Sequence, residues 1–302
     1  MYRRSGRLHY LVAVIVVALL SSVCVASAQG YGTGYSALTK ELSSPGYGTP
    51  NLQCAEPWAE DSTLVWGEVR SWEAENWTFA AGARTRTGED MDAELTLFTM
   101  DTSGEDRINE VVRDSEATLL GLNFKWVAHR KDQMTIAVIP GVEVPIGDME
   151  GTNTQIPATA VSDDIIPVLA IPLEFISDRG TVFRVVPRYV GFDEAPRVDA
   201  DTTINGFGDL FALAAGALHE TEQFSLMADV AVVLEGDNSI DVATNAPTDE
   251  LVWSAGGAWH AEDNDYRVDA FLTNAAGPTA ATSIIATPDQ SVGLGLRVSG
   301  EF

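Results

Sequence analysis

The sequence has few cysteines, few basic residues and, after its amino-terminal stretch, no long apolar run. Two cysteines among 302 residues are too few for a disulfide-rich scaffold or a four-thiolate zinc site. Lysine and arginine number 18 against 44 acidic residues, so the net charge is −26 and nucleic acid is not expected as a partner. With 45% hydrophobic residues, the chain has enough apolar side chains to fold, which excludes wholesale disorder.

The first 28 residues have the organisation of a secretory signal peptide. An arginine-rich start precedes the apolar run 11–20, and the tripeptide ASA at 26–28 matches the small-residue cleavage pattern. The run is shorter than the ~20 residues that a helical membrane anchor needs, which is the alternative interpretation. We therefore expect an exported mature chain, residues 29–302, from which Cys24 has been removed.

The rest of the chain alternates between apolar and polar residues, and helical periodicity is hard to find. Each alternating block is close to the 9–11 residues of a tilted transmembrane strand, or a little longer. The sequence predicts twelve strands, although the weaker first blocks leave ten or fourteen open. They are 63–72, 77–87, 93–100, 117–129, 134–146, 165–177, 181–192, 208–219, 223–235, 250–261, 265–274 and 291–302.

The connections between these blocks alternate in length from the third strand onward. Short turns alternate with long loops, which lie at 101–116, 147–164, 193–207, 236–249 and 275–290. Short periplasmic turns and longer outward loops are typical of an up-and-down barrel of the outer membrane. We therefore predict an all-β fold, a transmembrane antiparallel β-barrel over 63–302, with every long loop outside. A soluble secreted β-sandwich is the alternative.

Charges within the predicted strands fall mostly on the polar face. An ionised arginine or lysine against lipid costs about 2–4 kcal/mol at the bilayer midplane, so these side chains are expected to point into the lumen. Either they pair and fill the lumen, or they line a path for solutes, and the sequence leaves both open. The lumen-lining candidates are Arg70, Arg84, Arg86, Lys125, Glu143, Arg184, Arg188, Asp229, Arg267, Asp269 and Arg297.

The last strand resembles the carboxy-terminal signal of bacterial outer-membrane barrels. Leu294, Leu296, Val298 and Phe302 share one face of the block 291–302. The resemblance implies that these residues are an assembly signal, recognised by the barrel assembly machinery. The acidic long loops are expected to form a solvated surface beside outer-membrane lipids and lipopolysaccharide.

A second resemblance concerns the stretch 119–148, which is similar to a strand pair of outer-membrane transporters of the phenol meta-degradation family. It implies, over 117–302, a barrel that passes small molecules, and it supplies no catalytic residues. The likeness rests on Gly121, Lys125, Trp126, Pro145 and Gly147, with Ile146 in place of the usual threonine.

Catalytic and metal-binding patterns are missing from the mature sequence. A barrel hydrolase that places His and Ser two apart on one strand is excluded, because His129, His219 and His260 are not followed by such a serine. All three histidines fall at predicted short-turn ends, which favours interfacial positions. The pair Asp199 and Asp201 lacks the other ligands of a calcium loop. We expect no enzyme activity, cofactor or metal.

The segment 29–62 is rich in Gly, Tyr, Ser and Pro and is predicted to be a flexible periplasmic extension, with a plug inside the lumen as the alternative. It contains Cys54, the one thiol of the mature chain. Tryptophans and tyrosines near strand ends, including Trp66 and Trp72, favour aromatic girdles at the membrane interfaces. Prolines inside the strand 165–177 and its neighbours predict a bulge or a weakly paired seam.

Together these features predict a channel or transporter in the outer membrane that passes small molecules of unknown identity. A structural or adhesive barrel with a filled lumen and acidic surface loops is the first alternative. A soluble secreted β protein is the second.

Overall fold

The computed structural model describes most of the predicted barrel and part of the segment before it. The described residues are 48–56, 58, 62–72, 76–102, 117–131, 133–146, 165–177, 180–192, 197–199, 202–204, 208–221, 223–241, 246–261 and 266–302. The predicted signal peptide 1–28 and the beginning of the extension, 29–47, lie outside these residues.

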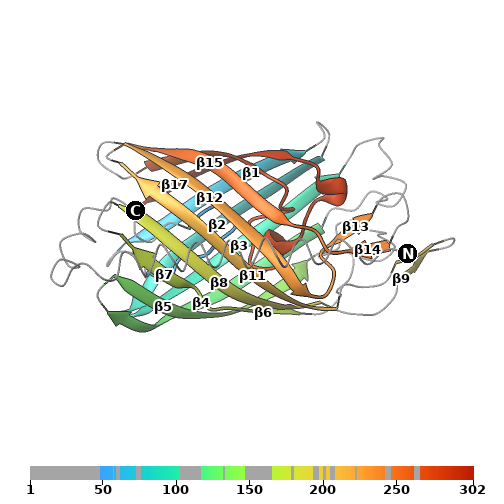
Figure 1. Cartoon of the computed structure of the whole chain (residues 1–302), viewed down its shortest axis with the longest axis horizontal. Coiled ribbons are helices and arrows are strands. Elements are labelled where there is room, and N and C mark those ends of the chain that lie inside the picture. The colour runs from blue at the N-terminus through green and yellow to red at the C-terminus, as the bar shows by residue number, and fades with distance from the viewer. Residues whose placement is uncertain are drawn as a thin grey trace.

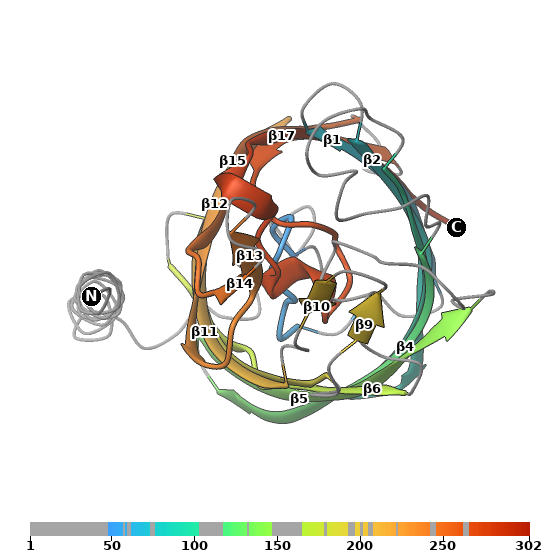
Figure 2. The ribbon, with the colours of Figure 1, turned by 90° about the vertical axis from the view of Figure 1, so that its right-hand side faces the viewer.

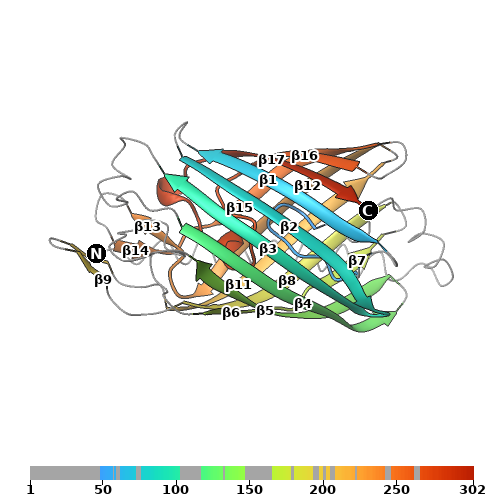
Figure 3. The same cartoon turned by 180° about the vertical axis from the view of Figure 1, so that it is seen from behind.

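A closed antiparallel β-barrel makes up the body of the molecule (Figures 1 and 3). Each strand of the barrel wall pairs with the wall strand that follows it along the chain, and the last pairs with the first, from Leu64 opposite Glu301 to Ser71 opposite Leu294. The sheet has thirteen strands. Because β6 and β7 occupy one position in the wall, the barrel has twelve strand positions, as predicted, and we call each of them a stave. They are β1 (Thr63–Trp72), β2 (Asn76–Gly88), β3 (Met91–Thr102), β4 (Ala117–Lys131), β5 (Met134–Ile146), β6 (Ile166–Ala170) with β7 (Leu173–Ile176), β8 (Thr181–Gly191), β11 (Asp209–Glu220), β12 (Phe224–Glu235), β15 (Val252–His260), β16 (Tyr266–Thr273) and β17 (Gly293–Glu301).

The described parts of the long connections carry short elements of their own. Two hairpins, β9 (Arg197–Asp199) with β10 (Thr202–Ile204) and β13 (Ser239–Asp241) with β14 (Ala246–Thr248), lie at the end of the barrel opposite Phe302 (Figure 1). The connection from β16 to β17 forms the short 3-10 helices η1 (Thr282–Ile284) and η2 (Pro288–Gln290). Across the described ranges, no helix is long and apolar enough to span a membrane.

The barrel is inverted relative to a water-soluble protein, with apolar side chains outside and charges inside. On β3, β4 and β5, the neighbours Leu95, Leu122 and Val142 are all exposed on the outer face. Leu226 and Leu294 are 68% and 61% exposed, whereas Arg70 and Arg184 are 1% exposed. An exposed apolar band of this extent marks a surface that meets lipid or another protein, and its strand alternation is that of a transmembrane barrel.

The sixth stave differs from the single continuous strand that was predicted over 165–177. It breaks at Ile171 and Pro172 into β6 and β7, because proline has no N–H to donate to the ladder. Ile171 N donates to Pro187 O at 3.0 Å, and Pro172 O accepts from Ala137 N at 3.0 Å, so the two neighbouring staves stay attached at the break. The predicted irregularity is therefore confirmed at this position.

Two of the tryptophans assigned to a girdle lie inside the barrel instead. Trp66 and Trp72 are 9% and 3% exposed, because the even-numbered positions of β1 face the lumen together with Glu68 and Arg70. Trp126 and other aromatic residues do lie on the outer face, at 54% exposure for Trp126. The girdle prediction was wrong for Trp66 and Trp72. It relied on their being tryptophans near strand ends and did not consider which face of the strand they occupy.

Candidate functional site

The lumen contains the charged residues that the alternation assigned to it. Nine of the eleven candidates are buried, and Arg297 keeps 16% of its side chain exposed. Arg86 lies at the short-turn end of β2, where its guanidinium donates to the carbonyl oxygens of Gly88 and Glu89. The buried nine are Arg70, Arg84, Lys125, Glu143, Arg184, Arg188, Asp229, Arg267 and Asp269.

Ion pairs across neighbouring strands hold the half of the lumen nearer the short turns. Arg84 Nη2 lies 3.0 Å from Glu94 Oε2, and Arg184 Nε lies 2.7 Å from Glu174 Oε2. The register places each pair directly opposite on adjacent strands. The two acids of these pairs, Glu94 and Glu174, were not singled out from the sequence. The available signal was that each lies on the inward face of its strand, beside a strand with a predicted lumen arginine. Lys125 and Asp92, 3.3 Å apart on neighbouring strands, form a third pair of this kind. Arg267 and Asp269, 2.5 Å apart, lie two residues apart on the same strand, β16.

Two arginines share one carboxylate nearer the long-loop end. Glu68 accepts from Arg70 Nε at 2.5 Å through Oε1 and from Arg297 Nη2 at 2.5 Å through Oε2. The Arg297 guanidinium also lies 5.2 Å from the ring centroid of Trp66, within cation–π range. One carboxylate thus binds two guanidinium groups, one through each of its oxygens.

Residues 48–56 and 58 lie in the lumen, and Figure 2 shows this part of the chain in blue inside the ring of strands. We call this segment the plug. Its centre is Asn51, whose backbone N and side-chain Nδ2 donate to the two carboxylate oxygens of Asp229 at 3.3 and 3.0 Å. Asn51 Oδ1 accepts from Arg70 Nη1 at 3.1 Å, and Asn51 O accepts from Arg188 Nη2 at 3.2 Å. The plug therefore forms hydrogen bonds with charged side chains from three different strands of the wall.

The second half of the plug contacts the other set of wall charges. Lys125 Nζ lies 3.2 Å from Cys54 Sγ and donates to Glu56 O at 2.7 Å. Glu56 Oε2 lies 3.1 Å from Arg130 Nη2. Trp58 N then donates to Asp92 just before the chain enters β1. Of the segment 29–62, predicted as a flexible extension or a plug, these residues lie inside the barrel; Ser62 leads directly into β1, and the remaining residues lie outside the part described.

The long connection between β16 and β17 also fills the lumen, contrary to the prediction that every long loop lies outside. Thr279 Oγ1 and Ala281 N donate to Glu143 at 2.8 Å each, and Ile284 and Ile285 are fully buried. The physical reason is composition: residues 274–292 carry one charge, Asp289, and several alanine and isoleucine side chains. We call residues 274–292 the inner loop, and Figure 2 shows it as orange-red segments beside the plug.

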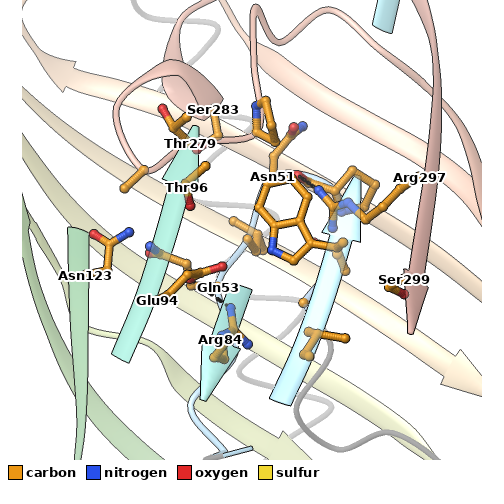
Figure 4. A pocket seen from close by; sticks show the side chains of 18 of the residues that line it. Asn51, Gln53, Arg84, Glu94, Thr96, Asn123, Thr279, Ser283, Arg297 and Ser299 are labelled. Atoms are coloured by element: carbon orange, nitrogen blue, oxygen red, sulfur yellow. Dashed lines mark hydrogen bonds and ion pairs between the residues drawn. The ribbon is translucent and has the colours of Figure 1, made fainter. Parts of the chain in front are cut away.

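A small polar cavity remains between plug, inner loop and wall (Figure 4). Its volume is about 60 Å³. Asn51, Arg188, Arg297 and Ser283 are among the side chains that line it. Arg188 Nη1 donates to Ala280 O at 3.1 Å and to the Ser283 hydroxyl, while its Nε is buried without a hydrogen-bond partner among the described residues. The site thus combines buried cations with neutral oxygens that the plug and loop supply.

One contact escaped the search for catalytic patterns. Ser225 Oγ lies 2.6 Å from His260 Nε2, and both side chains are buried inside the barrel. The two residues lie on neighbouring strands, β12 and β15, so a search along one strand could not find them. The interfacial position predicted for His260 was therefore wrong. Within the described ranges, no group of three or more His, Cys, Asp and Glu side chains is arranged to hold a metal ion.

Comparison with solved structures places the fold among outer-membrane barrels. An outer-membrane channel from Pseudomonas putida F1 superposes with a TM-score of 0.56 at 9% identity, over 82% of this chain and 98% of that chain. The NanC porin gives 0.48 at 10% identity over 79% and 98%, and the KdgM porin gives 0.47 at 7% identity over 79% and 99%. No protein-family model matches this chain, and no curated protein matches it by sequence. The likeness is one of fold.

Proposed function

We propose that this protein is an outer-membrane channel for small molecules, described here in its closed state. The observation that carries the proposal is the plug: it lies in a charge-lined lumen, where Asn51 is hydrogen-bonded to Asp229, Arg70 and Arg188, while Leu52 and Trp58 pack in the buried apolar cluster. Such contacts are individually worth about 0.5–3 kcal/mol, so they can be exchanged for contacts to a solute.

The location follows from the outer surface. The exposed apolar band and the buried charges suit a lipid environment, and the resemblance to outer-membrane channels supports the same membrane. Export would use the predicted signal peptide 1–28, with cleavage before residue 29. The resemblance to transporters of the phenol meta-degradation family supports passage of small molecules and leaves the solute open.

A structural barrel is the second candidate, and the filled lumen favours it. Here the plug and inner loop would be permanent filling, and the ion pairs would serve stability. The same contacts are compatible with both candidates, which differ in whether the contacts between plug and wall break during function.

Single-channel recording of the refolded mature protein, residues 29–302, in planar bilayers separates the candidates. Discrete conductance steps are expected for the channel. Stable, heat-modifiable insertion with no conductance, in the wild type and in variants with weakened plug contacts alike, would establish the structural barrel. A monodisperse protein in plain buffer that does not insert would overturn both.

A further inference from the structure

We infer that the lumen holds a binding site for a free α-amino acid, and that Asn51 of the plug occupies it in the closed state. The inference rests on the proposed function, because an internal site of this kind serves a solute that passes through the barrel. It names the class of solute from the contacts that Asn51 makes.

The first step is the covalent frame of Asn51. Its backbone N and O are separated by Cα and the carbonyl carbon, as are the amino nitrogen and a carboxylate oxygen of any α-amino acid. The backbone N donates to Asp229 Oδ2 at 3.3 Å, and the backbone O accepts from Arg188 Nη2 at 3.2 Å. A zwitterion in the same place would put its ammonium against the carboxylate and its carboxylate against the guanidinium.

The second step is charge. Arg188 has no carboxylate within ion-pair distance among the described residues, since its donors go to the neutral oxygens of Asn51, Ala280 and Ser283. Asp229 likewise accepts hydrogen bonds from the neutral groups of Asn51 and Ser254. A buried charge forms stronger hydrogen bonds when a charged partner replaces its neutral partners, because charge-assisted hydrogen bonds are about twice as strong as neutral ones.

The third step concerns which class of solute fits the sum of the charges. Arg70, Arg188 and Arg297 face this region together with Glu68, Glu143 and Asp229, so the formal charges cancel. A zwitterion leaves that balance intact, whereas a simple anion or cation would bring one uncompensated charge into a buried site.

The fourth step is the room for a side chain. Asn51 Nδ2 also donates to Thr273 Oγ1 at 3.3 Å, and Asn51 Oδ1 accepts from Arg70 Nη1 at 3.1 Å. Asn51 also lines the cavity of about 60 Å³ (Figure 4). A polar side chain about the size of asparagine matches the contacts that the plug already makes.

Calorimetric titration of the full mature protein in detergent micelles tests the inference, with L-asparagine as the probe. Succinamic acid lacks the amino group and 3-aminopropanamide lacks the α-carboxylate, so they are the matched controls. We expect L-asparagine to bind at least tenfold more tightly than either analogue. Equal affinity for the three compounds, or no binding of L-asparagine, would overturn the inference.

Three variants locate the site. Arg188→Gln is expected to weaken asparagine binding at least tenfold, while Arg86→Gln, at the mouth of the barrel, leaves it unchanged. Asn51→Ala is expected to tighten it, because a weakened plug competes less for the same groups. Unchanged affinity in Arg188→Gln, or weaker affinity in Asn51→Ala, would contradict the proposal. If Arg188→Gln does not fold, as judged by heat-modifiable mobility, Arg188→Lys and the analogue comparison on the wild type decide.

Binding in micelles and conductance in bilayers keep the two claims apart. A protein that conducts ions without binding L-asparagine would retain the proposed function and lose the inferred site. A protein that binds L-asparagine through Arg188 without conducting would retain the site and lose the channel.

Discussion

The side-chain amide of Asn51 lies 3.0 Å from the carboxylate of Asp229, although the two residues are 178 positions apart in the chain. Asp229 projects from the middle of β12 and Asn51 belongs to the plug, so this contact ties the plug to the wall of the barrel. Ser254 Oγ, from β15, donates to the same carboxylate at 2.6 Å. The carboxylate of Asp229 therefore joins the plug to two strands of the wall, β12 and β15.

Replacing Asn51 by alanine should make the proposed channel open more often. The substitution removes the side-chain bonds to Asp229, Thr273 and Arg70, each worth about 0.5–3 kcal/mol. Since ~1.4 kcal/mol is a factor of ten in an equilibrium, open events in planar bilayers should become at least tenfold more frequent.

The matched control lies two residues along the plug. Gln53 has a buried side-chain oxygen without a hydrogen-bond partner among the described residues, so Gln53→Ala should leave the frequency of opening close to that of the wild type. Equal behaviour of the two variants would show that the plug contacts do not set the closed state.

Cys54 should resist modification in the native protein. Its thiol is fully buried in the plug, with Lys125 Nζ at 3.2 Å and Arg84 Nη1 at 3.5 Å from Sγ. We expect a charged maleimide to leave the folded mature protein unmodified by intact mass and to label it after unfolding. A Thr87→Cys variant supplies an exposed thiol as the positive control. Rapid labelling of native Cys54 would place the plug outside the lumen for much of the time.

An arginine on the outer face near the middle of a strand should destabilise the inserted barrel. Leu122 lies on β4 between Leu95 of β3 and Val142 of β5, and all three are exposed. We expect Leu122→Arg to lower the free energy of unfolding in phospholipid vesicles by about 2–4 kcal/mol. Thr87→Arg, on the same outer face beside a short turn, should cost about 0–1 kcal/mol. Equal costs would mean that the band does not face lipid.

Ser225 should not behave as an activated nucleophile despite its contact with His260. The Ser225 side chain is 1% exposed inside the barrel, so a substrate carbonyl has no approach to its hydroxyl in the closed state. We expect a fluorophosphonate probe to leave the native protein unlabelled at Ser225 by peptide mass analysis. Labelling that is lost in His260→Gln would reopen the question of an enzyme.

Strand positions and the direction of each side chain were predictable because transmembrane strands have a strict period of two. The twelve predicted blocks agree with the staves to within about two residues at each end, apart from the break at Pro172. The predicted inward direction of Arg188 and Asp229 followed from the same parity. Both predictions needed local sequence only.

The contents of the lumen were not predictable in the same way. The plug has no periodicity, and its contacts join residues far apart in the chain, such as Asn51 and Arg188. The composition of the inner loop was a usable signal, since it lacks the acidic residues of the other long loops. The prediction placed it outside because it considered only the length of the connection. The pair of Ser225 and His260 depends on the register between two strands, which no single-strand pattern contains.

The junction of β1 with β17 sets an order of assembly. Thr63 and Phe302 exchange backbone hydrogen bonds at 2.8 and 3.0 Å, and this seam joins the residues of the barrel that are most distant along the chain. Pairings of such long range form late, because the loss of chain entropy precedes any gain. The plug immediately precedes β1, so the segment that occupies the lumen is tethered at the seam itself. We therefore expect closure of the seam to hold the plug at the lumen from the moment the barrel is complete.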